Sequence, residues 1–136
     1  MIDTYLTSSD PINECSLGFF VSLPYNPSLS KNAHYKRARN GRMFISKESV
    51  AARNEVHMLI RRVLEGSKLK FEKAKKIWVK IVVLKPDNRM DAINFLDAIA
   101  DVLKKEIDVD DRYFSVALLD WRIEKNDPKI LLEVFQ

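Results

Sequence analysis

Two groups of acidic residues lie on either side of one predicted helix, in a chain that is otherwise basic. The first group contains Asp87 and Asp91, and the second contains Asp110 and Asp111. Mg²⁺ binds carboxylates and fills its remaining positions with waters and phosphate oxygens. Lysine and arginine side chains attract the phosphates themselves. The combination is typical of metal-assisted chemistry on nucleic acid.

The same acids also have ordinary structural explanations. Asp91 occupies the position of a helix N-cap, where a carboxylate complements the helix dipole, and Asp110 and Asp111 suit a turn. The helix between the two groups is predicted for residues 92–106 and is about 20 Å long. The groups can therefore share an ion only if the chain doubles back or if two subunits meet. Spacing alone favours neither explanation.

Further polar residues are expected near such a site. The polar face of the predicted helix carries Asn94, Asp97 and Asp101, and Asp87 lies in the loop before it. We expect Asn94, Asp97 and Asp87 to lie around the direct ligands of the ion.

Basic residues are concentrated between residues 31 and 42. The chain has a net charge of +4 and a sequence pI of about 9.2, and this segment contains no acid. His34 and Tyr35 are interleaved with the basic residues, a pattern that suits contact with a sugar-phosphate backbone. The basic residues are Lys31, Lys36, Arg37, Arg39 and Arg42. A second basic region, residues 68–80, is more simply explained as solvated surface.

Composition places the chain among globular proteins with one domain. Its 136 residues are 46% hydrophobic and 31% charged, which suffices for one core but not for two. The single cysteine, Cys15, excludes an internal disulfide and a cysteine-rich zinc site. No apolar run approaches the roughly 20 residues of a membrane span, and the N-terminus lacks the pattern of a signal peptide. We therefore expect a soluble cytoplasmic protein with no membrane partner.

Hydrophobic periodicity predicts a single α+β domain at residues 18–136, preceded by a loosely attached arm at residues 1–17. Residues 77–84 are apolar on both faces, as in a central strand that is covered on both sides. The last two strands are predicted to pair as a hairpin. The predicted strands are 18–23, 42–45, 77–84, 113–123 and 130–135. The first predicted helix lies between Ser46 as its N-cap and Gly66 at its C-terminal cap position. The second predicted helix is 92–106. In this β-β-α-β-α-β-β order, two helices would pack on a mixed or antiparallel sheet.

Several segments, taken in order, resemble the RusA-type Holliday-junction resolvases, which are small dimeric endonucleases. The resemblance covers nearly the whole domain, from about residue 19 to residue 135. Residues 89–94 are similar to the family's R-x-D-x-D-N signature, and Asp110-Asp111 is similar to the acidic pair before the next strand. The proline-led segment 23–28, the strand 41–46 and the Asp-Val-Leu sequence at 101–103 also resemble family elements.

The resemblance implies a function and a set of site residues. Members of this family cut paired strands at DNA branch points with Mg²⁺ or Mn²⁺, in recombination and repair, and act as homodimers. It places the catalytic carboxylates on Asp91 and Asp111, and the metal ligands on these two residues and Asp110. It further implies that the DNA is held by Lys31, Asn32, Lys36, Arg37, Arg39, Arg42 and Arg89.

Two departures from the family pattern affect this site. Ile93 replaces the second aspartate of the signature, and Asp97 replaces a lysine that usually follows it. In the predicted helix Ile93 lies on the apolar face and should point to the core, where it cannot bind metal. Asp97 could partly replace the missing carboxylate. The alternatives are therefore a RusA-fold protein that binds branched DNA with weak or no cleavage, and a structural or partner-binding protein whose acids are caps and turns.

Overall fold

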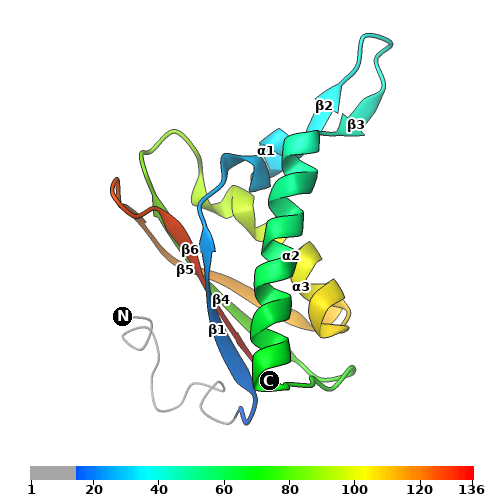
Figure 1. The fold of residues 1–136 in the computed structure, drawn as a ribbon, viewed down its shortest axis with the longest axis vertical. Helices are drawn as coiled ribbons and strands as arrows, with labels where there is room; N and C mark the ends of the chain where they lie inside the picture. Colours follow the sequence, from blue (N-terminus) through cyan, green and yellow to red (C-terminus); the bar gives the residue numbers. More distant parts are fainter. Residues whose placement is uncertain (1–14) are drawn as a thin grey trace.

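The computed structural model describes residues 15–136, apart from the side chains of residues 32, 34 and 35. They form one small α+β domain in which the helices α2 (Lys47–Ser67) and α3 (Leu96–Ile107) cover one face of a four-stranded sheet (Figure 1). The strand order is β1-β6-β4-β5, formed by β1 (Gly18–Pro24), β6 (Lys129–Phe135), β4 (Ile77–Lys85) and β5 (Phe114–Ile123). The predicted α+β class and the mixed sheet with two helices are confirmed.

β4 is buried on both faces, as its apolar pattern predicted. Its odd-numbered residues 77–83 pack beneath the helices, whereas Val82 and Leu84 form a smaller cluster on the other face with Leu119 and Leu131. β5 runs parallel to β4, and α3 lies in the connection between them. A parallel pair needs such a long crossover. This crossover places one acidic group after β4 and the other before β5.

The predicted hairpin between the last two strands is wrong. β6 runs antiparallel between β1 and β4, and the edge strand β5 pairs with β4 alone. Ile130, Leu132 and Val134 of β6 are fully buried, whereas β5 is only partly buried. A strand whose apolar face is fully covered gains most from a central position, so β6 takes the place between two neighbours.

The second predicted strand lies outside the main sheet. β3 (Met43–Ile45) pairs with β2 (Tyr35–Arg37), a short strand inside the segment that was expected to be a loop. The pair follows the single-turn helix α1 (Lys31–His34) and projects past the N-terminal end of α2 (Figure 1). Gly41 in its turn has a φ of +83°, a conformation that glycine adopts without strain.

The start of α2 follows the prediction and its end does not. Ser46 is the N-cap, and its hydroxyl accepts a hydrogen bond from a backbone N–H of the first turn at 3.1 Å. The helix continues through Gly66 to Ser67, and Lys68 adopts the left-handed φ of 55°. Ser67 Oγ donates to the carbonyl oxygen of Val63 at 2.7 Å. This bond ties the side chain of the last helical residue back onto the preceding turn.

The structure describes only residues 15–17 of the predicted N-terminal arm. The backbone N–H groups of Ser16 and Leu17 donate to the carbonyl oxygen of Gln136 at 3.1 and 3.2 Å. This part of the arm therefore lies beside the end of β6. No helix within residues 15–136 is long and apolar enough to cross a membrane.

Polar side chains fix α3 against α2. Arg53 Nη1 donates to Asp101 Oδ2 at 3.2 Å, and Arg61 donates to the two oxygens of Glu106 at 3.0 and 2.9 Å. His57 Nδ1 lies 2.7 Å from Glu106 Oε2. The Glu106 side chain is only 9% exposed, and burial alone would raise the pKa of its carboxyl. The hydrogen bonds and charges of Arg61 and His57 outweigh burial and lower that pKa.

We expect Glu106→Gln to lower the free energy of unfolding by about 1 kcal/mol at neutral pH, because the amide keeps the shape but loses charge-assisted hydrogen bonds. Since the pKa of Glu106 is lowered in the folded state, its stabilisation is present above the ordinary carboxyl pKa and is lost as the pH falls through the lowered value. Urea unfolding should show a gap between the two proteins that closes on acidification. A gap that persists in acid would contradict this account, and Glu55→Gln, at an exposed site of α2, is the control.

Candidate metal and nucleic-acid site

The last residue of β4 holds the loop that follows it. Lys85 is buried, and its Nζ donates to Asn88 Oδ1 at 2.7 Å and to the carbonyl oxygen of Met90 at 2.9 Å. The same ammonium lies 4.1 Å from the centre of the Trp121 ring in β5. A buried cation requires such partners. They tie the loop 86–91 to two strands, so Asp91 emerges from a fixed position.

Asp91 occupies the N-cap position of the 3₁₀ helix η4 (Ala92–Phe95), which leads directly into α3. Its side chain makes no capping hydrogen bond and is exposed. Its backbone carbonyl oxygen accepts from the Asn94 N–H at 3.1 Å. The side chain of Asp91 therefore does not cap the helix by a hydrogen bond, and the interaction of its charge with the helix dipole is the part of the structural explanation that stays a prediction. The exposed carboxylate is available to an external ligand.

Asp87 and Arg89 form a surface pair in the same loop. Asp87 Oδ2 accepts from Arg89 Nε and Nη2 at 3.0 and 2.8 Å, and Oδ1 accepts from the Arg89 backbone N–H at 3.0 Å. These hydrogen bonds, first of all those from the arginine side chain, lower the pKa of Asp87. Arg89 is largely exposed. The acid thus holds the predicted DNA contact in place at the edge of the loop.

A pocket of about 290 Å³ opens beside this pair. It is lined by Tyr25, Pro27, Pro86, Asp87, Arg89 and Met90. Burial, followed by the charge of Asp87, raises the pKa of Tyr25. The pocket joins the proline-led segment 23–28 to the signature segment 89–94, which are distant in the sequence.

Ile93 does not point to the core, and that prediction is wrong. Its side chain is 63% exposed. The prediction assumed an α-helix from Ala92 onward. The first turn is a 3₁₀ helix with about three residues per turn, so Ala92 and Phe95 face inward and Ile93 faces outward. Position 93, where the RusA-type signature has its second aspartate, therefore lies on the surface and is two residues from Asp91 in the chain.

The other polar residues expected near the ion lie on two helical segments. Asn94 belongs to η4 and is half-buried, and Asp97 is exposed in the first turn of α3. A carboxylate in a first turn complements the helix dipole. Asp97 therefore has a structural reason to be acidic, whether or not an ion binds nearby.

The second acidic group is partly engaged in local contacts. Asp110 caps the 3₁₀ helix η5 (Asp111–Tyr113), and its side chain accepts from the Arg112 N–H at 2.9 Å, which lowers the pKa of Asp110. Asp111 Oδ2 lies 3.5 Å from Lys104 Nζ, which is also 3.8 Å from Asp101 Oδ1. Asp110 therefore has the turn role that its sequence allowed, and Asp111 shares a surface cation with Asp101.

The two acidic groups lie at opposite ends of the sheet. β4 and β5 run side by side from their starts to their ends (Figure 1). Asp111, just before β5, therefore lies near the start of β4, whereas Asp91 follows the end of β4. A strand of this length places its ends about 26 Å apart. Residues 15–136 contain no group of three or more His, Cys, Asp or Glu side chains that could hold a metal ion. One chain alone does not bring Asp91 to Asp110 or Asp111.

Apart from Arg89, the predicted DNA-binding residues lie on the projecting strands β2 and β3, their turn and the helix before them. We call residues 35–45 the basic hairpin. Lys36 is exposed, and its Nζ lies 3.4 Å from Glu48 Oε2. The side chain of Asn32 is outside the described part of the chain. The other members are exposed and pair with no acid among the described residues: Lys31, Arg37, Arg39 and Arg42.

Two features of this region were not predicted from the sequence. One is the position of Lys85, which contacts both the Trp121 ring and the loop 86–91. The only signal for it in the sequence was a lysine at the end of an apolar strand. The other is the exposure of residues 43–45, which had been expected to form an ordinary strand. Neither a protein-family model nor a curated protein sequence matches this chain.

Proposed function

We propose that the chain is a metal-dependent endonuclease that cuts branched DNA, with four-way junctions as its substrate and a role in recombination and repair. The observation that carries this proposal is the exposed carboxylate of Asp91, which occupies a cap position without capping. An exposed carboxylate that makes no capping hydrogen bond, on a basic chain and two residues from an exposed arginine, suits a divalent ion that also binds phosphate. The resemblance to RusA-type resolvases supports the same function.

The proposed active form is a homodimer in which each site takes residues from both subunits. Asp91 and Asp111 lie near the two ends of α3. A two-fold axis across the middle of α3 would set the α3 helices of two subunits antiparallel, so that Asp91 of each subunit would face Asp111 of the other. The same axis would create two equivalent sites, one for each strand that is cut.

The predicted residues have different roles in this dimer. Asp91 and Asp111 would hold Mg²⁺ or Mn²⁺ directly, with Asp110 beside them. The bound ion would polarise the scissile phosphate and lower the pKa of an attacking water. Asp111 has to leave Lys104, which is a change of small cost because exposed ion pairs contribute little. Arg89 and the basic hairpin hold the DNA strands.

A second candidate function is the binding of branched DNA without cleavage. It is favoured by Ile93, because this exposed side chain lies where the family signature has a second carboxylate. With fewer carboxylates, a site holds a divalent ion less tightly. The basic hairpin and Arg89 would still bind phosphates, because these contacts do not need the ion.

Incubation of the protein with a synthetic four-way junction distinguishes these functions. We expect paired nicks near the branch point in Mg²⁺ or Mn²⁺ and none in EDTA, with a linear duplex of the same sequence as the control substrate. Tight, salt-dependent junction binding without nicks in either metal would establish the second function. Equal affinity for the junction and the linear duplex would contradict both.

A further inference from the structure

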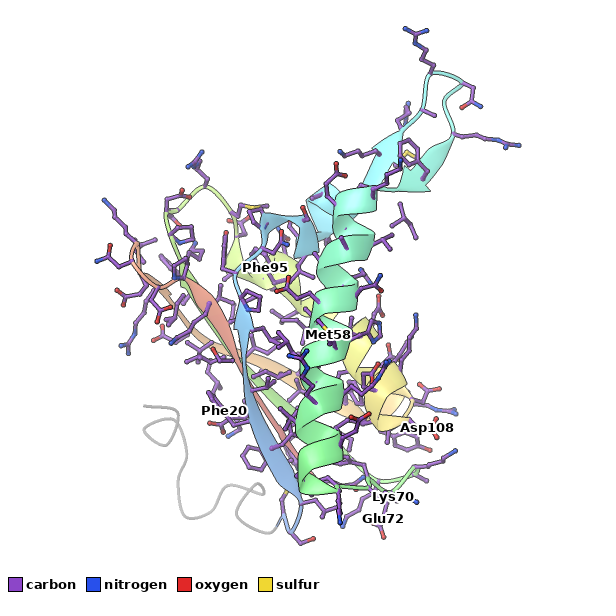
Figure 2. The ribbon with its side chains drawn as sticks, viewed as in Figure 1. Phe20, Met58, Lys70, Glu72, Phe95 and Asp108 are labelled. Atoms are coloured by element: carbon purple, nitrogen blue, oxygen red, sulfur yellow. The ribbon has the colours of Figure 1, made fainter. Side chains whose placement is uncertain are left out.

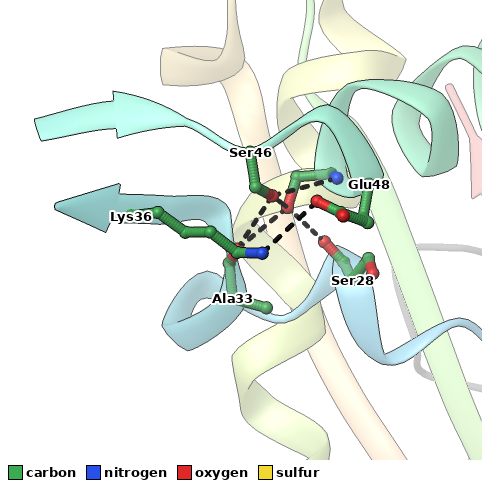
Figure 3. A network of polar contacts seen from close by, with 6 residues as sticks. Ser28, Ala33, Lys36, Ser46 and Glu48 are labelled. Atoms are coloured by element: carbon green, nitrogen blue, oxygen red, sulfur yellow. Dashed lines mark hydrogen bonds and ion pairs between the residues drawn. The ribbon is translucent and has the colours of Figure 1, made fainter. Parts of the chain in front are cut away.

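The basic hairpin is firmly anchored although it projects from the domain (Figure 2). Two buried serines hold its base (Figure 3): Ser46 Oγ donates to the carbonyl oxygen of Ala33 at 3.1 Å, and Ser49 Oγ donates to that of Ser28 at 2.8 Å. The ion pair between Lys36 and the first turn of α2 adds a contact on the surface. These contacts join the base of the hairpin to the segment 28–33 and to α2, and the rest of the hairpin projects beyond them.

β3 exposes three consecutive apolar side chains. Met43, Phe44 and Ile45 are 56%, 45% and 46% exposed, and none belongs to a hydrophobic cluster of the described domain. Successive residues of a strand point to opposite faces, so Phe44 lies on one face of the hairpin and Met43 and Ile45 lie on the other. Adjacent exposed apolar residues on a projecting arm indicate a surface that a partner covers.

The charge of the basic hairpin indicates the chemistry of this partner. No acidic residue occurs between residues 31 and 47, and Arg39 lies in the turn while Arg42 follows it directly. The basic hairpins of two copies of this chain would repel each other, and an apolar protein groove would leave the arginines without counter-charges. Nucleic acid satisfies both kinds of side chain, because phosphates pair with arginine and apolar wedges enter between bases.

We propose that the basic hairpin enters the open centre of a DNA branch point. Met43 and Phe44 unstack the bases beside the crossover, and Arg39 and Arg42 hold the flanking phosphates. Bases at a branch point are easier to displace than bases within a duplex, because unstacking costs least where pairing is already disturbed. This inference rests on the proposed function for its substrate, but it does not require cleavage.

The test is a binding titration of the full chain, in EDTA, with a four-way junction that carries 2-aminopurine beside the crossover. The emission of this base analogue rises when the base is unstacked. We expect the wild type to raise the emission severalfold at saturation. The double variant Met43→Ser/Phe44→Ser should bind with similar affinity and give little rise. The matched control is Met58→Ser/Phe20→Ser, which removes an exposed methionine and an exposed phenylalanine elsewhere and should behave as the wild type.

The two arginines are expected to act differently from the apolar residues. Arg39→Ala/Arg42→Ala should weaken binding and reduce the slope of log affinity against log salt by about 2, since each arginine neutralises about one phosphate. If the wild type bound the junction without a rise in emission, the inference would be overturned and the proposed function would stand. An equal rise in the Met43/Phe44 variant would have the same consequence. A loss of the rise in the control variant would also overturn the assignment to the hairpin. No preference for the junction over linear duplex would overturn the proposed function together with the inference.

Discussion

A mixture of Asp91→Asn and Asp111→Asn subunits should recover strand cleavage that neither variant shows alone. Each homodimeric variant lacks one carboxylate in both sites. We expect its cleavage rate to fall at least about 100-fold. Loss of a residue that only hydrogen-bonds to a metal ligand can already lower activity by about 100-fold, and these variants lose a proposed ligand itself. In a mixed dimer one site contains both substitutions, and the other keeps both aspartates, one from each subunit. The mixed dimer should therefore nick one strand of the junction.

The measurement requires mixed dimers that carry two different affinity tags and a junction labelled on each strand in turn. If each site were built within one chain, both sites of the mixed dimer would lack a carboxylate and no nicking would return. Glu65→Gln, which removes an exposed acid of α2 outside the proposed site, is the control and should keep the wild-type rate. Full activity of either single variant as a homodimer would contradict the assignment of that aspartate as a ligand.

Replacing Ile93 with aspartate should strengthen metal binding and speed cleavage. Ile93 is exposed, so the substitution neither opens a cavity nor buries a charge. It would add a second carboxylate at the signature position close to Asp91. We expect the affinity for Mn²⁺ to rise about 10-fold or more, because a further anionic oxygen ligand joins the site. The rate of junction cleavage in Mg²⁺ should rise with it.

Calorimetric titration of metal-free protein with Mn²⁺ measures this gain, and urea unfolding should show a stability within about 0.5 kcal/mol of the wild type. Val50→Asp introduces the same charge at another exposed apolar residue and serves as the matched control. An equal gain in both variants would show a general effect of charge. An unchanged affinity in Ile93→Asp would show that no ion binds beside Asp91.

Features that depend on neighbouring residues could be predicted from the sequence. Ser46 caps α2 because its hydroxyl needs only the N–H groups of the next turn. The face of α2 that contains Ala52, Val56 and Ile60 is buried, as its helical spacing predicted, and β4 is buried on both faces. Each of these patterns is repeated within one element, so a short window contains enough information.

Features that depend on distant partners could not be predicted in this way. An alternating pattern of apolar and polar residues fits an edge strand and a central strand equally well. The pattern of β6 therefore does not reveal that β6 also pairs with β1. The tight turn that exposes Ile93 accompanies the burial of Phe95, whose ring centre lies 5.2 Å from that of Tyr25. The spacing of the two acidic groups likewise shows that a helix separates them, but not that the flanking strands are parallel.

The position of β6 between β1 and β4 has a consequence for synthesis on the ribosome. β1 is the first strand that the structure describes, and its only strand partner within residues 15–136 is formed by residues 129–135. The helices, β4 and β5 can assemble earlier, but Val21 and Leu23 have no sheet to join until residue 135 has emerged. Pairing across such a separation in the sequence is slow. We therefore expect the nascent chain to expose an unpaired strand edge until β6 has emerged, and chaperones that bind apolar segments would act on it during this time.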